Sequence, residues 1–113
     1  MKITDTIKTE HKIVEIYKSS KGKSAEAEQA KNVVNLIIQY FELISLFTNV
    51  RHVDIVKRIY FSADNLFVVG MRGIAQRLYL HENTLYSYRK KYCTVINTIF
   101  LLLNLNGTGK VLL

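Results

Sequence analysis

The chain has 113 residues, which is enough for one domain with a single hydrophobic core. Apolar residues make up 49% of the chain and charged residues 22%, so the composition excludes a disordered tail. Sixteen Lys and Arg against nine Asp and Glu give a formal net charge of +7. That balance favours an anionic partner, most often nucleic acid.

Several classes of protein are disfavoured by what the sequence lacks. Cys93 is the single cysteine, so the chain has no internal disulfide and no cysteine-based metal site. Residues 1–23 are charged throughout and do not resemble a signal peptide. The longest apolar run, residues 95–105, is too short to span a bilayer. We therefore expect a cytoplasmic protein that does not engage membranes.

Chemistry-bearing side chains do not form a recognisable catalytic or metal-binding pattern. His11, His52 and His81 are far apart and lack the spacing of metal ligands. No Ser, His and Asp set stands out, and the segment around Gly109-Lys110 lacks the flanking residues of a phosphate loop. We expect no enzyme activity, no metal and no cofactor.

The first half of the chain predicts two helices. With no proline and five glycines in the whole chain, an all-α fold is expected. A short amphipathic helix is predicted from Thr4 to Lys18, followed by a linker over residues 19–23. Ser24 is a suitable N-cap for a second helix that runs to about Thr48. Because that helix is apolar nearly all round, it should pack either in the domain core or against a second copy.

The second half of the chain continues with further helical segments. A third helix is predicted over Arg51–Phe61, followed by turn residues at 62–65. Leu66–Gly70 is an apolar connector that fits either a strand-like run or the start of the next helix. The apolar residues 95–103 extend the last helix, and they should either fold back on the helix over 35–47 or form a subunit contact.

The most informative segment is Gly73–Tyr92, with the sequence GIAQRLYLHENTLYSYRKKY. Its apolar residues predict two short helices that cross over a shared core, with Leu80 filling the turn between them. The apolar face of the first helix is formed by Ile74, Ala75 and Leu78. The apolar face of the second helix is formed by Leu85, Tyr88 and Tyr92. The arrangement is typical of a helix-turn-helix whose second helix enters the major groove of DNA.

This segment resembles the helix-turn-helix of sigma factor region four and of the phage-type regulators of the autolysin regulatory protein (ArpU) family. IAQRLYLHENTLYSYRKKY is similar to the family pattern, and VDIVKRIYF is similar to the family's preceding helix, so the resemblance covers about Val53 to Ile99. Two positions depart from the pattern. His81 stands where the family has Ser, and Tyr79 stands where glycine is frequent. We expect a helical-like turn in which Tyr79 needs no positive φ.

The resemblance implies roles for individual residues in a DNA-binding mechanism. The side chains expected to face base edges are Glu82, Asn83, Tyr86, Ser87 and Lys90. Those expected to contact the DNA backbone are Arg72, Arg77, His81, Thr84, Arg89 and Lys91. Between Arg72 and Cys93 there are five basic residues and one acidic residue, so positive charge is concentrated on the motif.

Together these features predict a small all-helical, sequence-specific DNA-binding transcriptional regulator. Residues 1–50 would supply core and association, residues 51–106 the DNA-binding region and residues 107–113 a tail. Double-stranded DNA is the expected partner, the protein is expected to be a homodimer, and RNA polymerase is a candidate partner. Two alternatives stay open: a viral DNA-packaging adaptor like a small terminase subunit, and a helix-turn-helix module that binds protein.

Overall fold

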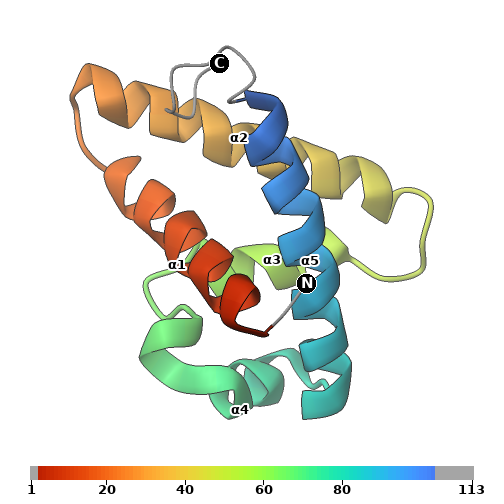
Figure 1. Cartoon of the computed structure of the whole chain (residues 1–113). Coiled ribbons are helices and arrows are strands. Elements are labelled where there is room, and N and C mark those ends of the chain that lie inside the picture. Colours follow the sequence, from red (N-terminus) through yellow and green to blue (C-terminus); the bar gives the residue numbers. More distant parts are fainter. Residues whose placement is uncertain (1–2, 104–113) are drawn as a thin grey trace.

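The computed structural model describes residues 3–103, and within that range every regular element is an α-helix (Figure 1). The predicted all-α class is therefore confirmed. The predicted tail over 107–113 lies outside the described residues. The helices are α1 (Ile3–Ser19), α2 (Ala25–Ser45), α3 (His52–Tyr60), α4 (Leu66–Leu78) and α5 (Glu82–Leu103).

Local capping explains where α2 begins, and a tertiary contact accompanies its end. The Ser24 side chain accepts a hydrogen bond from the N–H of Ala27 at 3.1 Å, as the sequence predicted. The helix ends at Ser45 rather than near Thr48. The buried Ser45 hydroxyl donates to the carbonyl of Phe41 and accepts the N–H of Val53 in α3 at 3.4 Å. The end of α2 is thus tied to the first turn of α3.

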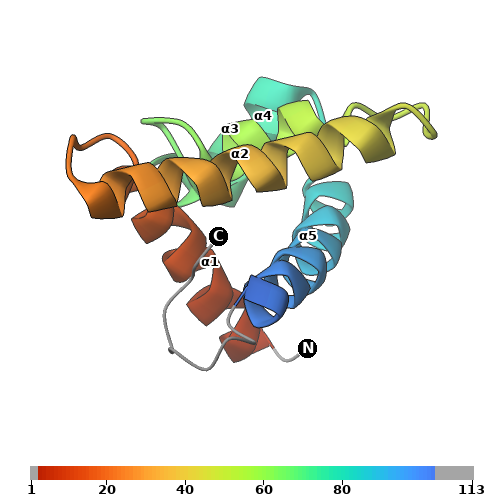
Figure 2. The same cartoon turned by 90° about the horizontal axis from the view of Figure 1, so that it is seen from above.

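Buried residues from all five helices form one hydrophobic cluster. Helix α3 lies at its centre, with α2 along one side of the molecule and α4 on the opposite side (Figures 1 and 2). The largest fully buried apolar side chains are Tyr60, Phe100, Ile13, Ile37, Ile59, Ile74, Leu85 and Ile96. The helices of the first half therefore share their core with the helix-turn-helix.

The apolar half of α5 packs mainly against α1 and not against the helix over 35–47. Ile96 and Phe100 are buried, and the ammonium group of Lys12 lies 4.6 Å from the centre of the Phe100 ring. Contact with α2 is made one to two turns earlier, where the rings of Phe41 and Tyr92 meet edge to face at 5.2 Å. Within residues 3–103, no helix combines the length and apolar character needed to cross a bilayer.

The apolar connector forms the first turn of α4 and is not a strand-like run, although its last residue, Gly70, is not helical. Asn65 caps the helix by accepting the N–H of Phe67 on its side-chain oxygen at 2.9 Å. The helix is kinked at Gly70, whose φ of 75° and ψ of 171° lie outside the helical region. Only glycine adopts that combination without strain. The kink separates the first turn of α4 from the part that precedes the helix-turn-helix turn.

Replacing Gly70 by alanine should lower the free energy of unfolding by about 1–3 kcal/mol, because a Cβ strains this backbone conformation. Nothing lies within 4 Å of the added Cβ, so crowding does not contribute. Urea denaturation of Gly70→Ala measures the effect. Gly22→Ala is the matched control, because its Cβ would make only ordinary contacts. Equal stability of Gly70→Ala and the wild type would contradict the assignment.

Candidate nucleic-acid interface

The turn between α4 and α5 consists of three residues and is closed by backbone hydrogen bonds. The N–H of Leu80 donates to the carbonyl of Ala75 at 2.9 Å, and the N–H of Tyr79 donates to the carbonyl of Gln76 at 3.3 Å. This pair of bonds is a Schellman motif, which requires a left-handed residue at its corner. Tyr79 is that residue, with φ 56° and ψ 38°. The expectation that Tyr79 would avoid a positive φ was wrong, because the Schellman bonds fix the backbone at this position.

The side chain of Tyr79 takes no part in closing the turn, since 96% of the residue is exposed. The turn therefore carries the steric cost of a Cβ in the left-handed region without a packing contribution from the ring.

His81 caps the N-terminus of α5. Its ring Nδ1 accepts the N–H of Asn83 at 3.1 Å, and its carbonyl accepts the N–H of Leu85. A serine hydroxyl commonly performs this role at an N-cap. His81 stands where the family pattern has serine, and its imidazole Nδ1 is the cap acceptor in place of a hydroxyl. The exposed ring remains beside the first amides of α5, where the sequence predicted a phosphate contact.

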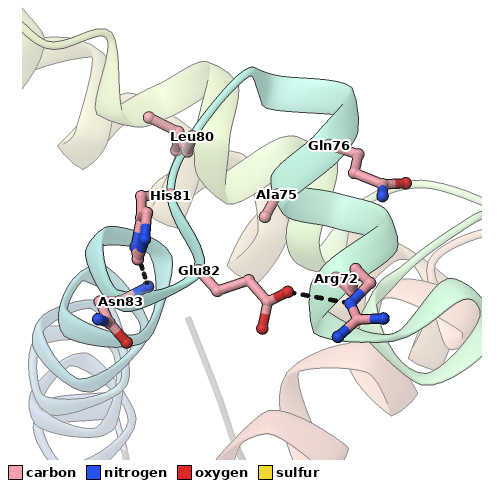
Figure 3. Close-up of a pocket in the computed structure, with 7 residues that line it drawn as sticks. All are labelled: Arg72, Ala75, Gln76, Leu80, His81, Glu82 and Asn83. Atoms are coloured by element: carbon pink, nitrogen blue, oxygen red, sulfur yellow. Dashed lines mark hydrogen bonds and ion pairs between the residues drawn. The ribbon is translucent and has the colours of Figure 1, made fainter.

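A shallow hollow lies between the two helices of the motif (Figure 3). Across it, the Nε of Arg72 donates to the Oε1 of Glu82 at 3.2 Å. Both side chains are well exposed, so this ion pair adds little to stability. The pair places the Glu82 carboxylate of α5 beside α4. The residues that line the hollow are Arg72, Ala75, Gln76, Leu80, His81, Glu82 and Asn83.

Four of the predicted base-reading residues share one exposed face of α5. Asn83, Tyr86, Ser87 and Lys90 follow the spacing i, i+3, i+4 and i+7, and all four are exposed. The ammonium group of Lys90 lies 5.1 Å from the centre of the Tyr86 ring. Glu82 lies at the edge of this face and turns toward Arg72. We call these four residues the α5 outer face.

Arg89 does not lie where the sequence placed it. Its guanidinium makes a bidentate ion pair with Glu10 of α1, with Nε to Oε2 at 2.9 Å and Nη2 to Oε1 at 2.6 Å. The Arg89 side chain is 11% exposed and the Glu10 side chain is fully buried. Nη1 also points to the sulfur of Met71 in α4. The expectation that Arg89 contacts the DNA backbone is therefore corrected, because its donors are committed to the core.

The hydroxyl of Tyr60 in α3 completes the group by donating to Oε2 of Glu10 at 2.6 Å. Burial, and to a lesser extent Cys93 and Glu10, raises the pKa of Tyr60, so the hydroxyl keeps its proton. Burial alone lowers the pKa of Arg89, but its hydrogen bond and charge interaction with Glu10 outweigh this and raise it. We call Glu10, Tyr60 and Arg89 the buried polar cluster.

Cys93 borders the buried polar cluster without joining its charge network. Its sulfur lies 3.4 Å from the Tyr60 hydroxyl, and the residue is fully buried. Burial raises the pKa of the Cys93 thiol to about 11, so it is neutral and unreactive at pH 7. Within residues 3–103, no group of three His, Cys, Asp or Glu side chains could hold a metal ion.

The other predicted backbone-contact residues flank the α5 outer face in different environments. Arg77 pairs with Asp64 at 3.1 Å and stays partly exposed. Thr84 is half-buried, whereas Lys91 is exposed on the side of α5 that faces α2. Among the cations predicted to meet DNA, Lys90 and Lys91 make no ion pair with any described residue.

Glu10 is the important residue that sequence reasoning missed. The sequence held a signal in its spacing, because Glu10 lies three and four residues before Ile13 and Val14 and therefore shares their helix face. In the structure Thr6, Glu10, Ile13 and Val14 are all buried. A carboxylate in an inward-facing stripe requires a partner of opposite charge. The partner lies 79 residues away in the chain, so its identity could not be read from local pattern.

Family models, curated proteins and solved structures yield no match to this chain. The geometry of α4, the turn and α5 is therefore the basis for inferring function.

Replacing Tyr79 by glycine should raise the free energy of unfolding by up to about 1 kcal/mol, because glycine adopts the left-handed region without steric cost. Thermal and urea denaturation measure the change. Tyr79→Ala is the control, since alanine keeps the Cβ and should bring no comparable gain. A destabilised Tyr79→Gly variant would show that the exposed ring contributes to the fold.

Replacing Arg89 by methionine should cost about 3–5 kcal/mol, because it leaves the buried Glu10 carboxylate without a cation. The double variant Glu10→Gln with Arg89→Met should recover much of that loss, since no buried charge is then unpaired. Urea denaturation of both single variants and the double variant measures the coupling. Additive losses would mean that the two residues act independently.

Proposed function

We propose that this chain is a sequence-specific DNA-binding transcriptional regulator, similar in its motif to sigma factor region four and the ArpU-type regulators. The observation that carries the proposal is the α5 outer face, which presents an amide, a phenol, a hydroxyl and an ammonium group along the first two turns after a capped N-terminus. These groups supply donors and acceptors of the kinds that read base edges in the major groove.

Three residues of the α5 outer face, and Glu82 at its edge, have distinct roles in this proposal. Asn83 can bond adenine through its amide, and Tyr86 can meet a thymine methyl group. Lys90 is the last residue of the face, and its long ammonium side chain can reach the neighbouring phosphate as well as a base edge. Glu82 can accept from cytosine, and its ion pair with Arg72 reduces the repulsion between its carboxylate and the DNA backbone.

Backbone contacts in the proposal come from the groups that surround the α5 outer face. Arg72, Arg77 and Lys91 supply charge, while His81 and Thr84 lie beside the free amides at the start of α5. Arg89 acts indirectly, because its ion pair with Glu10 fixes the orientation of α5 on α1. The protein is proposed to act in the cytoplasm as a homodimer on double-stranded DNA, with RNA polymerase as a candidate partner.

The first experiment is selection of bound duplexes from a random DNA pool at roughly physiological salt, where non-specific binding is weak. An enriched sequence supports the proposal, and a palindrome in it supports a two-fold dimer. Absence of enrichment, with no measurable DNA binding, would overturn the proposal in favour of a protein-interaction module. A ring of eight or more subunits would favour a packaging adaptor.

On the selected duplex, Asn83→Ala should weaken binding by about 1–3 kcal/mol and relax the preference at one base pair. Lys90→Ala should weaken binding to all sequences and lower the salt slope by about one unit, because a phosphate contact is lost. Fluorescence anisotropy across a salt series measures both. Lys21→Ala is the matched control, because Lys21 is also an exposed lysine near a tyrosine ring but lies between α1 and α2. Equal effects of Lys21→Ala and Lys90→Ala would contradict the assignment.

A further inference from the structure

Tyr86, on the α5 outer face, lies against two cations of its own helix. The ammonium group of Lys90 lies 5.1 Å from the centre of the Tyr86 ring, and the guanidinium carbon of Arg89 lies 5.8 Å from it. Residues three and four positions apart are neighbours on a helix, so one ring can contact both side chains. A cation over the face of an aromatic ring is attracted to it. The position of the Tyr86 ring therefore depends on where these two cations lie.

The two cations differ in how firmly they are held. Lys90 is exposed and makes no ion pair with any described residue. Three nitrogen atoms of Arg89 are engaged, because Glu10 accepts from Nε and Nη2 and the sulfur of Met71 accepts from Nη1. The guanidinium is therefore immobilised independently of Tyr86. A contact with a fixed group costs less conformational entropy than a contact between two mobile side chains.

The Glu10 carboxylate fixes that guanidinium and is itself fixed. Glu10 is fully buried, and the Tyr60 hydroxyl donates to its Oε2 at 2.6 Å. A buried ion pair contributes little net stability compared with apolar side chains of similar volume, because both ions lose their hydration. Its bidentate geometry, by contrast, is strongly directional. A fixed direction for the Arg89 side chain is thus what the buried pair supplies and apolar packing would not.

The start of α5 is held by other contacts. Backbone hydrogen bonds close the turn as far as Leu80, and His81 caps the N–H of Asn83. None of these bonds involves Arg89, so Asn83 should keep its place when the buried ion pair is removed. Tyr86 lies further along the helix, beside Arg89 itself, and depends on it directly.

We propose that Glu10 is a positioning residue for DNA reading: through Arg89 it holds the Tyr86 ring, and with the ring Lys90, in the orientation that meets a base pair. Helix α1 thereby belongs to the DNA-reading unit, although it lies outside the helix-turn-helix. The inference rests on the proposed function, since it concerns how the α5 outer face reads its base pairs.

Combining Glu10→Gln with Arg89→Met in the full chain tests the proposal, because it removes one charge of each sign and keeps the formal net charge at +7. Fluorescence anisotropy with base-substituted variants of the selected duplex measures discrimination at each base pair. Tyr86→Ala and Asn83→Ala identify the base pairs that those two residues read. At the Tyr86 base pair the double variant should lose about fivefold in discrimination. At the Asn83 base pair discrimination should be unchanged, and so should the salt slope, since no phosphate contact is lost.

Combining Glu28→Gln with Lys31→Met is the matched control, since the same substitutions remove an exposed ion pair of α2. It should leave discrimination and the salt slope as in the wild type. An equal loss at every base pair would indicate a merely structural role, and no loss at the Tyr86 base pair would show that the ring is positioned without Glu10. Either result would overturn the proposal.

Circular dichroism checks that the double variant is folded. Should it unfold, Tyr60→Phe takes its place, because this substitution removes one hydrogen bond to Glu10 and no charge. It should cause a smaller loss of discrimination confined to the Tyr86 base pair, and discrimination equal to that of the wild type would overturn the proposal.

A measurement without DNA separates this inference from the proposed function. In NMR spectra of the free protein, the Tyr86 ring current should shift the ε-methylene protons of Lys90 upfield, and this shift should shrink in the double variant. A shift that the double substitution leaves unaltered would defeat this inference even if the protein binds DNA. A shift that depends on Glu10 and Arg89, in a protein that binds no DNA, would defeat the proposed function but uphold the positioning of Tyr86.

Discussion

The ion pair between Glu10 and Arg89 holds the helix-turn-helix in its place on the rest of the chain. It joins α1 to α5 through two short hydrogen bonds, and Tyr60 and Met71 add contacts from α3 and α4. Four of the five helices therefore meet at one buried group. Because hydrophobic packing is weakly directional and a bidentate ion pair is strongly directional, this cluster determines how α5 is rotated against its neighbours.

The same ion pair reduces the number of unpaired cations on the helix-turn-helix. By sequence, the segment from Arg72 to Cys93 holds five basic residues and one acidic residue. In the structure, Glu10 neutralises Arg89, Glu82 faces Arg72, and Asp64 faces Arg77. Surface pairs such as the last two contribute little to stability, whereas the buried one is costly to break. The cations available to a polyanion are thus the exposed ones, and the buried arginine has a structural role.

Much of the fold was predictable because it depends on local pattern. Ser24 caps a helix through an atom three residues away, and the apolar spacing around Ala75 and Leu85 predicts two packed helices. The α5 outer face followed from the same periodicity. The ends of α2 and the direction in which residues 95–103 fold were less accessible, since both depend on contacts between distant segments. Arg89 was misplaced for that reason, because nothing near it in sequence reveals Glu10.

Tyr79 and His81 show what the turn between α4 and α5 physically requires. Its shape is fixed by backbone bonds from Tyr79 and Leu80 to the last turn of α4, and these do not depend on the side chain at position 79. The start of α5 needs an acceptor for the N–H of Asn83, and an imidazole nitrogen serves as a hydroxyl would. Glycine and serine are the least costly residues at these positions, but the geometry tolerates others at a modest loss of stability. Helices α4 and α5 are therefore joined by this three-residue turn without glycine at its corner or serine at the cap, because backbone bonds and an imidazole acceptor supply the same constraints.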